Sequence, residues 1–318
     1  MKNRIVRFAT PGIDKDIQPK ENDVPKTNKE VRPQDDLYEY VNGEFIKNAK
    51  IPADHSSVGG FITLRDNVEK IMLKEFKSLA RGRKSDDPLV DKAVLLYRKA
   101  MEEDDKKRMG LPYVQKKLAY LDGLKNLDDV VSYLPYLYDN EYDLPFQIGV
   151  DVDMKDTSRH VVMITSPSII LPDTTYYQND AGKKLLSVFQ DMAEKVLAFF
   201  YEEKKAKKIV KEALRFDKVL STLVKSQEEL ADYIKSYNPY DVEKLVSQMA
   251  PLKMRSFLRV RYGVLPKKVI VAEPRYFENF SQVLNEKTVP LYLSWAKLNC
   301  ALSFAPLLSE ELRLLAGT

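Results

Sequence analysis

The stretch PQDDLYEYVNGEFIKNAKIPADHSSVGGFITLRDN, residues 33–67, decides how the fold begins. Asp36 suits a helix N-terminus, because a carboxylate there meets exposed N–H groups and the positive end of the helix dipole. The next residues place apolar side chains on one helical face: Leu37, Tyr40, Val41 and Phe45. Gly43 interrupts this pattern, so we expect a short helix whose apolar surface needs a partner.

Helical spacing of apolar residues continues along most of the chain. Arg81 and Gly82 end a long helix, and Asp87 followed by Pro88 supplies an N-cap and a first helical residue. The predicted helices cover residues 61–79, 88–101, 113–121, 127–138, 185–200, 209–224, 242–249, 254–262, 276–284 and 289–304.

Between residues 146 and 165 the period of the apolar residues changes to two. Apolar and polar residues alternate from Phe146 to Met154, a polar turn follows at 155–158, and residues 160–165 supply a partner strand. This pattern predicts a hairpin with a half-buried first strand, and residues 269–272 form another short β-like run. The predicted fold class is mainly α, a multi-helical lobe with a small antiparallel β-hairpin or sheet.

Two regions differ in composition. Residues 1–32 are rich in Lys, Asp, Asn and Pro and have little apolar periodicity, which is typical of a mobile arm. No later stretch is rich enough in Gly or Ser to mark a linker. We therefore expect a mobile arm at 1–32 and one helical region at 33–318, incomplete at its C-terminal end.

The charge balance argues against a nucleic-acid partner. The chain has 51 Lys and Arg against 47 Asp and Glu, a net charge of only +4. Nucleic-acid binding calls for basic residues clustered on one face. The densest basic cluster, residues 204–208, lies among glutamates, which is typical of a solvated helix surface.

Cysteine usage and hydropathy bear on location. Cys300 is the only cysteine, so no intrachain disulfide forms, as in a reducing compartment. Its apolar neighbours at helical spacing predict a buried small hydrophobe. The first 20 residues lack the apolar segment of a secretory signal, and no run of 18 apolar residues occurs. We expect a cytoplasmic protein with no membrane partner.

Four stretches in order resemble the neprilysin-like zinc metalloendopeptidases, in particular the prokaryotic endopeptidase O branch. They are residues 33–67, LPDTTYY at 171–177, YNPY at 237–240, and residues 269–277 followed by YLSW at 292–295. The resemblance covers nearly everything after residue 30. Gln34 and Asn42 stand where extracellular members carry cysteines, which agrees with an intracellular protein.

The resemblance implies one substrate-binding residue, Arg65. In the family, the arginine of Phe-x-x-Leu-Arg-Asp binds the terminal carboxylate of the peptide, a task that suits the planar guanidinium fork. A second family arginine corresponds to Ser57, so we expect weaker or less selective carboxylate binding. The alternative is that Arg65 forms a helix-surface ion pair with Asp66 or Glu69.

The zinc chemistry of the family has no counterpart in this sequence. A zincin needs H-E-x-x-H on a helix, and neither His55 nor His160 begins that motif. The string from Glu228 to Asp232 fits the family's Glu-x-x-x-Asp pattern but lacks histidine partners, so a solvated helix end is expected. Three aspartates, Asp151, Asp153 and Asp156, lack the Gly and Glu of a calcium loop and are expected to face solvent.

We therefore expect no catalytic residue, metal ligand or cofactor in this chain, with zinc belonging to the full-length family. The leading hypothesis is the N-terminal, non-catalytic part of a zinc metalloendopeptidase that hydrolyses oligopeptides, truncated before the zinc site and inactive alone. Its expected partners are the missing C-terminal zinc domain and an oligopeptide substrate. Two alternatives are a standalone helical peptide-binding or regulatory protein and an inactive remnant of an interrupted gene.

Overall fold

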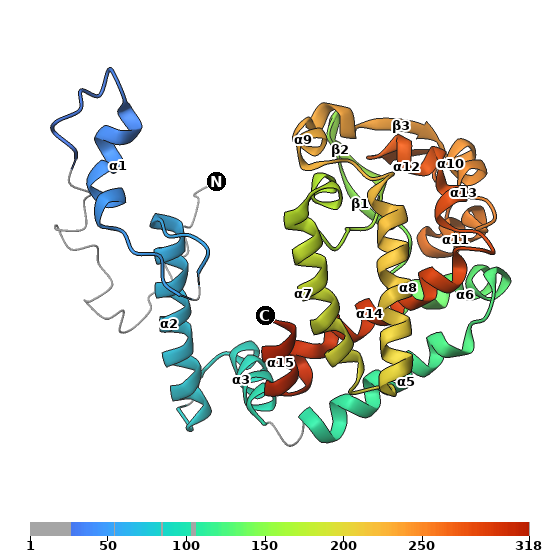
Figure 1. The fold of residues 1–318 in the computed structure, drawn as a ribbon, viewed down its shortest axis with the longest axis horizontal. Helices are drawn as coiled ribbons and strands as arrows, with labels where there is room; N and C mark the ends of the chain where they lie inside the picture. Colours follow the sequence, from blue (N-terminus) through green and yellow to red (C-terminus); the bar gives the residue numbers. More distant parts are fainter. Residues whose placement is uncertain (1–26, 54, 84, 103–105, 318) are drawn as a thin grey trace. The chain divides into compact units, whose positions relative to one another are not determined.

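The structure, a computed structural model, describes residues 27–53, 55–83, 85–102 and 106–317. Most of the expected mobile arm, residues 1–26, lies outside the described residues. The contacts divide the chain into two compact units, residues 1–94 and 95–318 (Figure 1). The predicted domain boundary between residues 32 and 33 stays a prediction.

Unit 1 contains the two helices predicted on either side of Pro52. Helix α1 (Leu37–Asn48) begins where expected, with the Asp36 side chain accepting a hydrogen bond from the Glu39 N–H at 2.8 Å. Helix α2 (Gly60–Ala80) ends before Gly82, whose φ of 112° is readily available only to glycine. Helix α3 (Pro88–Met101) starts at the predicted proline and runs across the division between the units.

The predicted interruption at Gly43 is wrong, because α1 continues through it. The Asn28 N–H donates to the Tyr40 carbonyl at 2.7 Å, and the Asn28 amide donates to the Glu39 carboxylate at 3.1 Å. A Cβ at position 43 would collide with the Glu39 carboxylate and press on the Asn28 amide. The absence of a side chain at Gly43 thus allows the Asn28 segment to lie close to the helix. It does not break the helix.

Unit 2 is mainly helical, as predicted. Its helical elements are η3 (Lys106–Gly110), α5 (Leu111–Gly123), α6 (Leu127–Asp139), η4 (Thr174–Gln178), α7 (Asp180–Leu197), α8 (Glu203–Ser221), α9 (Gln227–Ala231), η5 (Tyr233–Ser236), α10 (Val242–Gln248), α11 (Met254–Tyr262), α12 (Pro274–Glu278), α13 (Phe280–Val283), α14 (Val289–Leu308) and α15 (Glu310–Ala316). Helix α14 packs against both α8 and α5 (Figure 1).

The sheet of unit 2 is larger than the predicted hairpin. It contains β1 (Gln147–Asp153), β2 (Asp156–Thr165), β3 (Asn238–Asp241) and β4 (Lys268–Val271) in the order β1-β2-β4-β3. The predicted hairpin is confirmed, with β1 antiparallel to β2. This antiparallel hairpin is part of a mixed sheet, in which β4 pairs parallel with β2 and β3 pairs antiparallel with β4 at the other edge.

Two further expectations need correction. The first strand is not half-buried over its outer part: β1 is an edge strand, and Val150 is 53% exposed. The predicted helix at 276–284 divides into α12 and α13. At the division, the Asn279 side chain donates to the Arg275 carbonyl at 2.8 Å, and such local bonds compete with the helical ladder.

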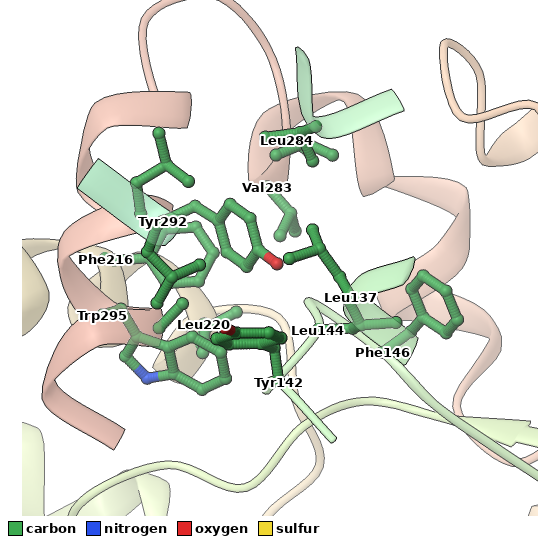
Figure 2. Close-up of a cluster of buried hydrophobic side chains, with 14 of the residues drawn as sticks. Leu137, Tyr142, Leu144, Phe146, Phe216, Leu220, Val283, Leu284, Tyr292 and Trp295 are labelled. Carbon is green, nitrogen blue, oxygen red and sulfur yellow. The ribbon is translucent and has the colours of Figure 1, made fainter. Parts of the chain in front are cut away.

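The core of unit 2 lies where α8 and α14 meet the segment between α6 and β1. Phe216, Tyr292 and Trp295 pack together there (Figure 2). Their ring centroids lie 5.5–6.3 Å apart. The Tyr292 hydroxyl donates to the Asp143 carbonyl at 3.1 Å, and the Tyr276 hydroxyl donates to the Pro145 carbonyl at 2.7 Å. Buried tyrosines therefore satisfy backbone carbonyls of the segment that leads into the sheet.

Candidate functional site

The predicted substrate-binding residue, Arg65, projects from α2 in unit 1. Its Nη2 lies 3.2 Å from Asp66 Oδ1, and its Nε lies 3.7 Å from Glu69 Oε1. The side chain is 59% exposed, so these ion pairs contribute little to stability. The contacts match the alternative interpretation of Arg65 as part of a helix-surface ion pair. They also leave much of the guanidinium open to a ligand.

The loop before α2 brings His55 against the same cluster. His55 Nε2 lies 3.0 Å from Asp66 Oδ2 and 3.5 Å from Arg65 Nη2. One carboxylate, that of Asp66, thus contacts both an imidazole and a guanidinium. The sequence carries no signal for this arrangement, because a contact between a loop and a helix follows no periodic pattern. Ser57, on the same loop, is exposed.

The residues considered for metal binding do not form a metal site. Within the described ranges, no group of three or more His, Cys, Asp or Glu side chains could hold a metal ion. Asp151 accepts from the Val152 N–H at 2.7 Å, and Asp156 accepts from Ser158. The expectation that Asp153 faces solvent is wrong, because it is buried and accepts from the Tyr237 hydroxyl at 2.7 Å.

The Glu228–Asp232 string forms α9 and the residue after it. The helix is fastened at its start, where Ser226 and Glu229 form a capping box. The Glu229 carboxylate also accepts two hydrogen bonds from Arg275, at 3.0 and 2.9 Å. Glu228, Glu229 and Ala231 are exposed, as expected for a solvated helix end, and the bonds from Arg275 also link α9 to α12.

Three of the four stretches that carry the family resemblance converge in unit 2. Tyr177, from the stretch at 171–177, donates to Asp217 on α8. Tyr237 bonds to the hairpin through Asp153, and the stretch at 269–277 supplies β4 and Glu273. The buried Glu273 carboxylate accepts from Thr165 Oγ1 at 2.9 Å, Ser166 Oγ at 2.6 Å and the Lys225 N–H at 2.7 Å. These hydrogen bonds link segments of unit 2 that are distant in sequence, so the residues that make them have structural roles.

A cavity of about 580 Å³ opens in unit 2 where α6 ends and β1 begins. The buried rings of Tyr142 and Trp295 contribute to its wall, together with Asp143 and Arg261. Burial raises the pKa of the Asp143 carboxyl above its ordinary value, although a hydrogen bond with Asn299 opposes the shift. Segments far apart in sequence form this cavity, so no local pattern signals it.

The expectation for Cys300 is confirmed. The side chain is buried in α14, and the loss of solvation raises the pKa of its thiol to about 11. A thiol in such surroundings stays protonated at neutral pH and is a poor nucleophile. Cys300 is therefore a packing residue.

The described part of unit 1 leaves the apolar faces of α1 and α2 largely uncovered. Phe61 is 90% exposed, and several further large apolar side chains on these two helices are also exposed: Leu37, Tyr38, Val41, Phe45, Ile46, Leu64, Val68, Met72 and Leu73. Apolar stripes of this extent mark interaction surfaces. This observation confirms the expected apolar surface at the start of the chain. Within the described ranges, no helix has the length and apolar character needed to cross a bilayer.

Comparison with known proteins adds a consistent set of similarities. The N-terminal model of "Peptidase family M13" matches residues 33–317. The chain is 32% identical to a neutral endopeptidase of Lactococcus lactis, over 90% of this chain and 46% of that protein. It is 33% identical to the neutral endopeptidase of Lactobacillus helveticus, over 92% of this chain and 45% of that protein. The chain thus spans just under half the length of these relatives.

Solved structures agree with this assignment. PepO of Lactobacillus rhamnosis superposes with a TM-score of 0.79 at 28% identity, over 90% of this chain and 46% of that one. The zinc metalloprotease Zmp1 of Mycobacterium tuberculosis gives a TM-score of 0.76 at 23% identity, over 92% of this chain and 45% of that one. The second similarity shows a shared fold alone.

Proposed function

The chain belongs to peptidase family M13, and we propose that it is the non-catalytic part of a zinc metalloendopeptidase that hydrolyses oligopeptides. The main support for this proposal is the match of the N-terminal family model over residues 33–317. Relatives of about twice this length are neutral endopeptidases. The residues present do not fit a zinc site, because the sequence lacks H-E-x-x-H. In this proposal the remaining part of such an enzyme holds the zinc.

We propose that Arg65 binds the terminal carboxylate of the peptide. Its described ion pairs engage Nε and Nη2, so the side chain can turn part of its fork toward a ligand. A well desolvated charge-assisted bond of this kind contributes roughly 1.5–3 kcal/mol. Because Arg65 is exposed to solvent in this chain, we expect its bond to the peptide carboxylate to contribute less than this.

The proposed protein partner is the C-terminal zinc domain, in the same or a neighbouring chain. The exposed apolar faces of α1 and α2 support this proposal, because they need a cover that the described part of unit 1 does not supply. The purified chain should therefore associate and bind hydrophobic dyes. A monomer without dye-binding surface contradicts the proposed interface. We also propose a cytoplasmic location, which is supported by the single buried cysteine.

Incubation of the purified chain with zinc and an oligopeptide tests the catalytic side of the proposal. We expect no cleavage, and cleavage that a chelator abolishes would contradict it. The neighbouring coding sequence separates the alternatives. A downstream open reading frame that encodes H-E-x-x-H supports a split or interrupted enzyme. The absence of such a frame, together with cooperative folding of this chain alone, supports a standalone peptide-binding or regulatory protein.

A further inference from the structure

The Asp66 carboxylate bridges two groups at the proposed carboxylate-binding site. Its Oδ1 contacts the Arg65 guanidinium and its Oδ2 contacts the His55 imidazole, at 3.2 and 3.0 Å. Only 17% of the His55 side chain and 27% of the Asp66 side chain are exposed. The imidazole is therefore held in place between the loop and α2, close to the guanidinium.

The charges of this cluster oppose a carboxylate ligand when His55 is neutral. Arg65 then faces two carboxylates, those of Asp66 and Glu69, both on α2. With hydrogen on Nε2, the imidazole donates to Asp66, and protonation of the ring adds a full positive charge. Protonation gives His55 a positive charge 3.0 Å from Asp66 Oδ2 and balances that carboxylate. The guanidinium charge is then less compensated by its own neighbours and more available to an incoming anion.

We propose that His55 is a positioning residue that makes carboxylate binding by Arg65 depend on pH. The protonated imidazole neutralises Asp66, so the site favours peptides with a free terminal carboxylate under mildly acidic conditions. An imidazole gains its proton within the range in which a peptide carboxylate stays ionised. This inference rests on the proposed role of Arg65.

The test uses the full 318-residue chain and an N-acetylated oligopeptide with either a free C-terminal carboxylate or an amide. The chain has only two histidines, so the imidazole region of an NMR spectrum contains two sets of signals. His160 lies exposed on β2 in the other unit and serves as the internal control. We expect affinity for the carboxylate peptide to rise about three- to five-fold from pH 8 to pH 5.5, as for a partly exposed charge pair. The amide should show no such rise, and at a fixed pH the addition of the carboxylate peptide should shift the His55 signals and leave the His160 signals in place.

Two variants test the role of His55. His55→Gln should give the same affinity for the carboxylate peptide at both pH values. Asp66→Asn removes the charge that His55 balances, so its affinity at pH 8 should match that of the unmodified chain at pH 5.5. A pH-dependent rise that persists in His55→Gln would overturn the inference.

Arg65→Gln separates this inference from the proposed function. Loss of the preference for carboxylate over amide at both pH values supports the role of Arg65. If the preference survives in Arg65→Gln, or if the unmodified chain shows none at either pH, the proposed role of Arg65 fails. If Arg65→Gln removes the preference but His55→Gln leaves the pH response intact, only the role of His55 fails.

Discussion

The buried carboxylate of Asp217 on α8 accepts a hydrogen bond from the hydroxyl of Tyr177, which lies in the stretch at 171–177. The same carboxylate accepts from the Ile170 N–H at 2.9 Å. Both bonds fasten the connection between β2 and α7 to the core. Burial outweighs these bonds and raises the pKa of Asp217 from 3.8 to about 6.

Acidification should therefore increase the contribution of Asp217 to stability. Above pH 6 the carboxyl is ionised in the folded and unfolded chains, and the folded chain bears the cost of a buried charge. Between pH 6 and pH 4 the folded chain takes up the proton while the unfolded chain stays largely ionised. The free energy of unfolding, relative to an Asp217→Asn variant, should rise by about 2–3 kcal/mol from pH 7 to pH 4. Urea unfolding at a series of pH values measures this difference.

A Tyr177→Phe variant provides the control for this prediction. The Tyr177 bond lowers the pKa of Asp217, so its removal should move the pH-dependent rise in stability to higher pH. The same pH profile in the unmodified chain, Asp217→Asn and Tyr177→Phe would show that Asp217 does not titrate in this range.

Gly182→Ala should destabilise the chain although alanine favours helices. Gly182 lies in the first turn of α7, and an added Cβ would overlap the Tyr176 carbonyl, a backbone group of η4. The overlap should cost about 1–3 kcal/mol, against a gain of up to about 1 kcal/mol from helix propensity. The matched control is Gly123→Ala at the end of α5, where a Cβ meets nothing within 4 Å. In chemical denaturation, Gly123→Ala should have a higher free energy of unfolding than Gly182→Ala. Equal values would contradict the close approach of Gly182 to the Tyr176 carbonyl.

Glu273→Ala should cost about 3 kcal/mol in unfolding free energy. The variant leaves two hydroxyls and the Lys225 N–H without their buried acceptor, and each unsatisfied buried group costs about 1–3 kcal/mol. Glu273→Gln keeps one acceptor oxygen and the shape of the side chain, so it should lose about half as much. The denaturant midpoints of the two variants compare their stabilities. A Glu273→Gln variant that is less stable than Glu273→Ala would contradict this prediction.

Most helices could be predicted because their signals are local. The stripe of α8 and the Asp87-Pro88 start of α3 lie within a few turns of sequence, and so does the pairing of Arg65 with Glu69. The sheet could be predicted only in part. The hairpin has a local pattern, but the parallel pairing of Val162 with Val269 joins segments that no period connects.

Site residues whose partners come from distant segments could not be predicted from local patterns. His55 reaches Asp66 from a loop, and a contact between a loop and a helix follows no helix or strand period. Asp153 alternates with apolar residues as an exposed strand residue should. It is buried because Tyr237, from a distant segment, supplies its hydrogen bond. The apolar pattern therefore identified α2, and the family resemblance singled out its arginine, whereas tertiary contacts determine the surroundings of that arginine.

Ser57→Arg should strengthen binding of peptides with a free terminal carboxylate. Ser57 is exposed on the loop that carries His55, so a guanidinium there can reach solvent without a burial cost. A second cation near Arg65 should raise affinity by up to about five-fold at low salt, and the gain should shrink in 0.5 M salt because screening weakens exposed pairs. Calorimetric titration with carboxylate and amide forms of one peptide measures the effect. Ser57→Gln, similar in reach but uncharged, is the control, and an equal gain in that variant or with the amide peptide would show that charge at position 57 is not the cause.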